Sequence, residues 1–281
     1  RMSNHLSLEQ LSEGICDSSN LNRIEHGKRY ADKLTRDRML GRIGIDGYDY
    51  ENYINIKEYG QWKIRMEILN NISNGNLKEA YQKIKTYSES YDKYCNGNLK
   101  MQFCIFAYAQ IKKRKGYNRR LGRIFADALE CTVKCSCDMI SSKVLSVQEL
   151  LFIMDDACYN RKPERMQIYE QVVEYIEKPY FDVFSKAMIY PKAVVNICRE
   201  IFMEQNEPDR QSYVRMLELC SGAKDILGEA KRTYYLWELS RLLKNIYSYF
   251  LKNDGENSEN GVTREQAEGN QGFMRAFKEA G

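Results

Sequence analysis

Four turn signals divide the middle of the chain at nearly constant intervals. They stand 41, 44 and 46 residues apart, at Gly75-Asn76, Gly116-Tyr117-Asn118, Asn160 to Pro163 and Asn206 to Pro208. Each lies between two apolar runs with helical periodicity, such as residues 61–74 and 77–91. A helix pair that recurs at such a period is typical of stacked helical repeats. We therefore predict four helix pairs, followed by a last helix at residues 229–252.

The composition permits long helices and argues against a membrane or secreted protein. Only 4 of the 281 residues are Pro, while 43% are hydrophobic and 29% charged, as in ordinary folded proteins. No run of about 18 apolar residues occurs, and no apolar leader precedes a cleavage site. The 9 Cys residues are scattered and odd in number, which favours reduced thiols. We expect an all-α, cytoplasmic protein that does not bind a membrane.

The first 45 residues carry the signals of short helices joined by tight turns. Ser7, with Gln10 three residues later, has the pattern of a capping box at the start of a first helix. A second helix is predicted at residues 18–26, where Gly27 ends it. A third amphipathic helix is predicted at residues 34–43. Two short helices with a turn between them are the skeleton of a helix-turn-helix.

The segment from Leu6 to Arg29 closely resembles the helix-turn-helix of Xre and phage-repressor proteins. Its most specific part is Leu21-x-Arg23-Ile24-Glu25-x-Gly27-x-Arg29, and its Ile15-Cys16 turn resembles that of the Rgg- and PlcR-type quorum-sensing regulators of bacteria. The resemblance implies that tetratricopeptide-like repeats follow the DNA module and bind a short signalling peptide on their concave face.

This resemblance and the helical pattern together set the expected organisation. We expect a helix-turn-helix DNA-binding domain at residues 1–45, a right-handed α-superhelix of tetratricopeptide-like helix pairs at 46–252, and a flexible tail at 253–281. The family usually has a basic helix before the motif. Only five residues precede Leu6, so we expect either that the native N-terminus is longer or that the DNA module is incomplete; an opening Arg1 rather than Met favours the first.

The second predicted helix has the side chains that read DNA. Short polar residues near a helix N-terminus fit the major groove, and flanking cations hold phosphates. Cations outnumber acids between Ser18 and Arg42, which predicts a local basic patch. The alternative is an ordinary solvated helix face. The candidate DNA-binding residues are Ser18, Ser19, Asn20, Asn22, Arg23, Lys28 and Arg29.

A peptide groove needs polar and aromatic side chains on the inner helices of the repeats. The candidates are Tyr108, Asp155, Tyr159, Asn196, Arg199, Tyr234 and Glu238. Because operators are read as two half-sites, we expect a homodimer on double-stranded DNA. The alternatives are a tetratricopeptide-like scaffold that binds a protein but no DNA, and a regulator with a non-peptide ligand.

Two further clusters were weighed for chemistry. Cys131, Cys135 and Cys137 form a dense thiol group, but structural zinc sites use four ligands and usually CxxC spacing, so buried packing is the favoured interpretation. Residues 112–123 hold seven cations and no acid, which suits either contacts to DNA flanks or a solvated turn, the latter being favoured. No Ser/His/Asp set, Gly-rich phosphate loop or supported carboxylate pair occurs. We therefore expect no enzymatic activity, cofactor or metal.

Overall fold

The computed structural model describes residues 1–45, 56–90, 96–133, 137–204 and 208–257. In these ranges the chain forms helices, turns and loops, and no residue lies in a strand. The predicted all-α class is therefore confirmed. Residues 46–55, where the predicted repeat domain begins, and nearly all of the expected tail lie outside the described residues.

Short helices build the N-terminal part at the places that the sequence indicates. A 3-10 helix, η1 (Met2–Asn4), precedes α1 (Leu8–Ser12), α2 (Ser18–Glu25) and α3 (Lys33–Arg42). The capping box is present, because the Ser7 side chain accepts a hydrogen bond from the Gln10 backbone at 3.1 Å and the Gln10 side chain accepts one from the Ser7 backbone at 2.8 Å. Gly27 ends α2 with φ of +67°.

The remaining helices alternate with the predicted turns. They are α4 (Ile56–Ser73), α5 (Leu77–Glu89), α6 (Gly97–Arg114), α7 (Leu121–Glu130), α8 (Val147–Tyr159), α9 (Arg165–Ile176), α10 (Val183–Glu204), α11 (Arg210–Glu229) and α12 (Leu236–Asn257). A second 3-10 helix, η3 (Cys137–Ser142), lies between α7 and α8. The Asn206 turn falls partly outside the described residues.

The predicted start of the last helix at Glu229 is wrong. Glu229 is the end of α11, and α12 begins seven residues later at Leu236. The chain reverses between them with Lys231 at φ +52° and Tyr235 at φ +61°, a left-handed conformation that side chains other than Gly seldom adopt. Neither residue type signals such a turn. The helix also extends to Asn257, past the predicted boundary of the tail at residue 253.

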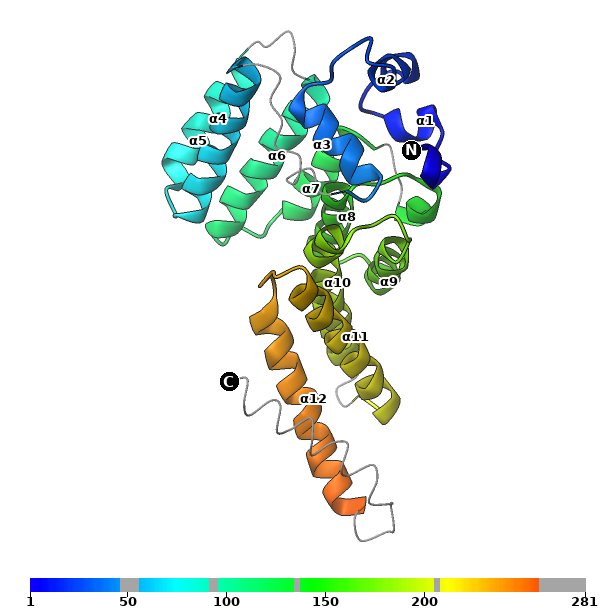
Figure 1. The fold of residues 1–281 in the computed structure, drawn as a ribbon. Helices are drawn as coiled ribbons and strands as arrows, with labels where there is room; N and C mark the ends of the chain where they lie inside the picture. The colour runs from blue at the N-terminus through cyan, green and yellow to red at the C-terminus, as the bar shows by residue number, and fades with distance from the viewer. Residues whose placement is uncertain (46–55, 91–95, 134–136, 205–207, 258–281) are drawn as a thin grey trace.

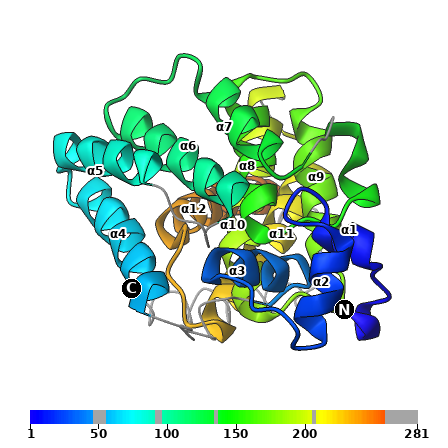
Figure 2. The same ribbon diagram turned by 90° about the horizontal axis from the view of Figure 1, so that it is seen from above.

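Each helix from α4 to α12 packs against the next one along the chain, and the first helices of neighbouring pairs also meet, α4 with α6, α8 with α10 and α10 with α12. Figure 1 shows these helices following one another from the upper left to the lower end of the molecule. Figure 2 shows α4 to α9 along an arc around α10 to α12. The main apolar core runs through α6 to α12, and a smaller one joins α4, α5 and α6.

Helix α3 packs against the body of the molecule. It contacts α6 and α8 as well as α1 (Figures 1 and 2). Two glycines allow the backbones to approach closely at its flanks. A Cβ atom on Gly14 would lie 1.9 Å from the carbonyl oxygen of Thr132, and one on Gly44 would lie 2.3 Å from that of Tyr180. The N-terminal segment is thus closely fitted to the helices that follow.

Candidate functional site

Helix α2 presents a polar face to solvent. Leu21 is buried and Ile24 is half-buried, and both belong to the small core under α1 and α2. On the other side Ser19, Asn22 and Arg23 are exposed. Ser18 and Asn20, also candidates, are half-buried at the start of the helix. The alternation follows the helical period, so the residues expected to read base edges share one accessible side.

The two cations after α2 are arranged differently. Lys28 is exposed, and its backbone nitrogen bonds the Arg23 carbonyl oxygen at 2.8 Å in the turn that ends the helix. Arg29 is exposed as well, but its Nη1 donates to Asn20 Oδ1 at 2.6 Å. Arg29 therefore holds Asn20 at the N-terminal end of α2, which leaves Arg23 and Lys28 as the more available cations of the seven candidates.

The predicted basic patch does not extend from α2 into α3. The four cations of α3 contact acidic side chains: Lys33 bonds Asp37 at 3.1 Å, Arg36 bonds Glu58 at 3.0 Å, and Arg38 and Arg42 both approach Glu149. Charge counting along the sequence cannot show these pairs, because two of the partners lie on other helices. Between Ser18 and Arg42, the exposed cations without an acidic partner among the described residues are therefore Arg23, Lys28 and Arg29.

A buried ion pair fixes α3 to the start of α8. Arg42 is 1% exposed and Glu149 is 0% exposed, with Arg42 Nη2 2.8 Å from Glu149 Oε1. Arg42 Nη1 also donates to the carbonyl oxygens of Leu11 and Glu13. Burial tends to raise the pKa of Glu149, but the charges of Arg42 and Arg38 and the hydrogen bonds outweigh it and lower the pKa to about 2. The carboxylate is therefore ionised at neutral pH.

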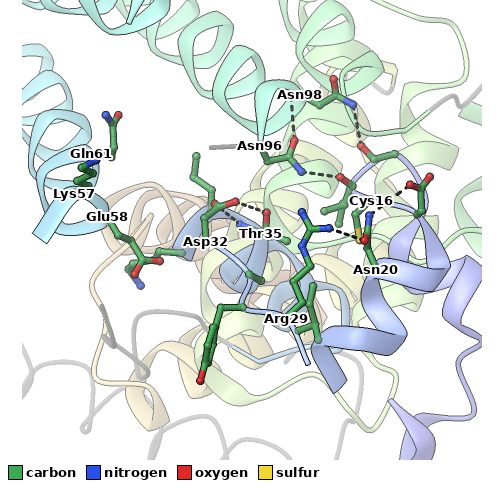
Figure 3. A pocket seen from close by; sticks show the side chains of 18 of the residues that line it. Cys16, Asn20, Arg29, Asp32, Thr35, Lys57, Glu58, Gln61, Asn96 and Asn98 are labelled. Carbon is green, nitrogen blue, oxygen red and sulfur yellow. Dashed lines mark hydrogen bonds between the residues drawn. The ribbon is translucent and has the colours of Figure 1, made fainter. Parts of the chain in front are cut away.

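A polar cleft of about 900 Å³ separates the N-terminal segment from α4 and the start of α6 (Figure 3). Asn96 Nδ2 donates to the Ile15 carbonyl oxygen at 2.6 Å, and Asn98 Nδ2 donates to that of Gly14 at 3.2 Å, so the upper wall is tied to the α1–α2 turn. Gln61 projects from the opposite wall (Figure 3). Cations and acids line the cleft together, and this mixture favours no single ligand class.

Four of the seven candidate peptide-binding residues gather around one tyrosine. Burial, together with the charges of Asp155 and Glu238, raises the pKa of Tyr235 against the opposing charge of Arg199, to about 12. Tyr159 is part of the same group. These side chains come from α8, α10 and the first residues of α12, although they are far apart in sequence.

Two lysines complete this group. Lys192 Nζ lies 2.6 Å from Asp155 Oδ1; burial lowers the pKa of this lysine, and the aspartate opposes that effect. Lys113, at the end of α6, lies near Tyr159. Burial raises the pKa of Tyr159, and the positive charge of Lys113 partly opposes that effect. We call Lys113, Asp155, Tyr159, Lys192, Asn196, Arg199, Tyr235 and Glu238 the inner polar cluster.

Asn196 is the member with an unused donor. It is 7% exposed and stands one helical turn after Lys192 on α10. Its Nδ2 has no hydrogen-bond partner among the described residues. Leaving a buried amide donor unpaired costs about 1–3 kcal/mol, so such a donor usually has a partner in the protein, in ordered water or in a bound molecule. An extended peptide backbone offers the carbonyl acceptors that this donor lacks.

The other two peptide candidates lie elsewhere. Tyr108 packs near Tyr81 of α5, with ring centres 6.3 Å apart. Tyr234 is 48% exposed, and the neighbouring Tyr235 takes the place expected for it. Sequence reasoning missed Tyr235, Lys113 and Lys192. The spacing of Lys192 four residues before Asn196 was a usable signal, because residues i and i+4 share a helix face.

The remaining sequence features give no further site. Cys135 lies outside the described residues, and Cys131 is half-buried with a pKa raised by burial. No cluster of His, Cys, Asp and Glu suited to a metal occurs in the described ranges. No described helix is both long and apolar enough to cross a membrane. In the basic run 112–123, Arg123 pairs with Asp127 at 2.9 Å on an exposed surface.

Comparison of the chain with protein-family models, with curated proteins and with solved structures finds no match.

Proposed function

We propose that this chain is a transcription regulator that reads double-stranded DNA with α2 and is controlled by a short signalling peptide bound at the inner polar cluster. In this proposal α1 and α2 form the helix-turn-helix, and α4 to α12 form the tetratricopeptide-like sensor. The observation that carries the DNA-reading role is the exposed polar face of α2, with Ser19, Asn22 and Arg23 directed away from the core. Arg can pair with a guanine edge, and Asn with an adenine edge.

Replacing Arg23 by Ala should weaken binding to specific DNA about ten- to a hundredfold, which corresponds to about 1–3 kcal/mol for one base-edge contact. The DNA would be selected from a random duplex pool with the whole chain, and binding measured by mobility shift at two salt concentrations. A homodimer should select two half-sites about 10 base pairs apart. Arg241, exposed on α12 and outside every basic run considered for DNA, supplies the control: Arg241→Ala should bind as the parent does. Full affinity in Arg23→Ala would exclude α2 as the reading helix.

The observation that carries the peptide-sensing role is the unpartnered Nδ2 of Asn196 within the inner polar cluster. An extended peptide supplies a carbonyl oxygen for this donor. The neighbouring Arg199 is exposed, and Glu238 is half-buried, so charges of both signs are within reach of a peptide end. If the ligand is not a peptide, this site should bind molecules without amide carbonyl groups more tightly than peptides.

The Asn196→Ala variant should retain at least about fivefold less peptide, since a peptide carbonyl oxygen left buried without its donor costs about 1–3 kcal/mol. The measurement is affinity selection from a synthetic pool of short random peptides on the whole chain, followed by mass spectrometry. Asn245→Ala, which changes an exposed amide on α12, is the matched control. Equal retention by Asn196→Ala and Asn245→Ala would place peptide binding elsewhere or exclude it.

A further inference from the structure

A small cavity lies beneath α3, away from the inner polar cluster. Its volume is about 220 Å³, and it lies between α3 on one side and α4, α6, α8 and α10 on the other. None of the residues of the inner polar cluster lines it. Its apolar lining residues are Leu34, Ile45, Trp62, Met66, Leu69, Leu99, Phe103, Phe106, Val147, Phe152 and Met188, and its charged lining residues are Lys33, Asp37, Arg38 and Arg65. The charged side chains bond other groups of the protein, Lys33 to Asp37, Arg38 to Glu149 and Arg65 to Tyr87, so the aromatic and thioether groups remain for a flat apolar guest.

Two buried polar atoms in the lining have no partner. Gln102 is 1% exposed, and its Nε2 donates to Ala128 O at 2.9 Å and to Thr132 Oγ1 at 2.8 Å, but its Oε1 accepts no bond within the described residues. Ser185 is 0% exposed, and its Oγ likewise lacks a partner there. Because the Nε2 bonds fix the amide orientation, Gln102 Oε1 can only accept. Buried polar groups rarely stay unpaired in a folded protein, so a missing donor is indicated.

The apolar side chains and the two unpaired polar atoms together restrict which molecules can bind in the cavity. An apolar ring would fill the space between the aromatic walls, and a dry cavity of about 150 Å³ is known to hold benzene. A donor on that ring would meet Gln102 Oε1 or Ser185 Oγ. A charged guest is disfavoured, because the charged side chains of the lining already bond other groups of the protein and burying an unpaired charge is costly.

We propose that this cavity is a binding site for an apolar aromatic ring that carries a hydrogen-bond donor, such as a phenol or an indole. The guest is either a free small molecule or the side chain of a peptide. It touches α3 through Leu34 and Gly41 and touches α8 through Phe152, so it adds contact between the N-terminal segment and the helical body. A ligand that binds only the docked arrangement stabilises that arrangement. This goes beyond the proposed function, because the site is separate from the inner polar cluster and needs no DNA.

The test compares p-cresol with p-xylene, which has a methyl group in place of the hydroxyl. Ligand-observed NMR on the whole chain measures both affinities. The chain has 2 Trp residues, so in Trp237→Phe protein the emission of Trp62 reports occupancy of the cavity itself. We expect p-cresol to bind about fivefold more tightly than p-xylene, the ratio that one net hydrogen bond supplies. Failure of both rings to bind at millimolar concentration would overturn the proposal.

Variants of the lining decide whether the polar atoms and the volume are responsible. Ser185→Ala and Gln102→Met each remove one unpartnered atom, and the preference for p-cresol should disappear in at least one of them; an unchanged preference in both overturns the proposal. Met188→Trp fills the cavity and should abolish binding, whereas Met203→Trp, at a 72% exposed position of the same helix, should not. Melting curves confirm folding, and the two smaller substitutions remain informative if Met188→Trp does not fold.

A last arm separates the two sources of the ring. Free p-cresol is compared with the capped tripeptide acetyl-Gly-Tyr-Gly-amide. Tighter binding of the tripeptide, lost in Ser185→Ala or Gln102→Met, identifies the guest as a peptide side chain. Tighter binding of p-cresol identifies it as a free small molecule. Mobility-shift experiments with DNA are not involved, so a negative result here leaves the role of α2 unaffected.

Discussion

Glu149→Gln should lower the free energy of unfolding by about 3–5 kcal/mol, because it leaves Arg42 buried without its ion-pair partner. Arg42 and Glu149 are 1% and 0% exposed, so water cannot replace the lost carboxylate. The amide also keeps the volume of the side chain, so the loss reports charge and hydrogen bonding rather than a cavity. Urea unfolding followed by circular dichroism is the measurement.

The pH dependence of stability should change in the same variant. The folded pKa of Glu149 is about 2, below its ordinary value of 4.5, so its contribution is complete above pH 4.5 and is lost as the pH falls from there towards 2. Between pH 4.5 and pH 2, the free energy of unfolding of the Glu149→Gln variant should therefore fall less than that of the parent. Glu67→Gln is the control, because Glu67 pairs with Lys83 on the surface at 40% and 34% exposure and should give no measurable change. Equal stability of parent and Glu149→Gln would contradict the buried pair.

Gly44→Ala should destabilise the protein by at least about 3 kcal/mol, for two reasons that add. Gly44 has φ of +79°, a conformation that costs other residues about 1–2 kcal/mol. Its Cβ would also lie 2.3 Å from Tyr180 O and 2.6 Å from Phe181 Cα, which are backbone atoms that cannot turn away. The same unfolding experiment measures the effect.

Gly75 provides the matched control. Its φ is +81°, nearly that of Gly44, but nothing lies within 4 Å of a Cβ placed there. Gly75→Ala should therefore show only the conformational cost of about 1–2 kcal/mol. The difference between the two variants measures the close approach of the segment after α3 to the segment before α10. Similar losses in both would mean that this approach contributes nothing to stability.

Local signals in the sequence were sufficient for most helix boundaries. The capping box at Ser7, the left-handed Gly27 and the turn at Gly75 act within a few residues of the chain, and all three are present in the structure. The start of α12 was misplaced because the reversal there uses Lys231 and Tyr235, which carry no turn preference of their own. Prediction failed where the conformation is imposed by packing rather than by local chemistry.

In the candidate sites too, features set by local sequence could be predicted and features set by packing could not. The exposed face of α2 follows from helical periodicity alone, so its residues could be named in advance. The basic patch could not be judged, because the pairing of Arg42 with Glu149 joins positions more than a hundred residues apart. The inner polar cluster contains Tyr235 rather than the predicted Tyr234. The left-handed turn at Lys231 and Tyr235 decides which of these two neighbours belongs to it.

The small core beneath α2 has a consequence for how the molecule opens. Leu11, Leu21 and Met39 close their cluster only with Leu99 of α6 and Val144, which precedes α8. The first 45 residues therefore do not enclose a core by themselves. Backbone amides in α3 should exchange with solvent deuterium at the rate of α8 rather than at the rate of a separate domain, since both belong to one cooperative unit.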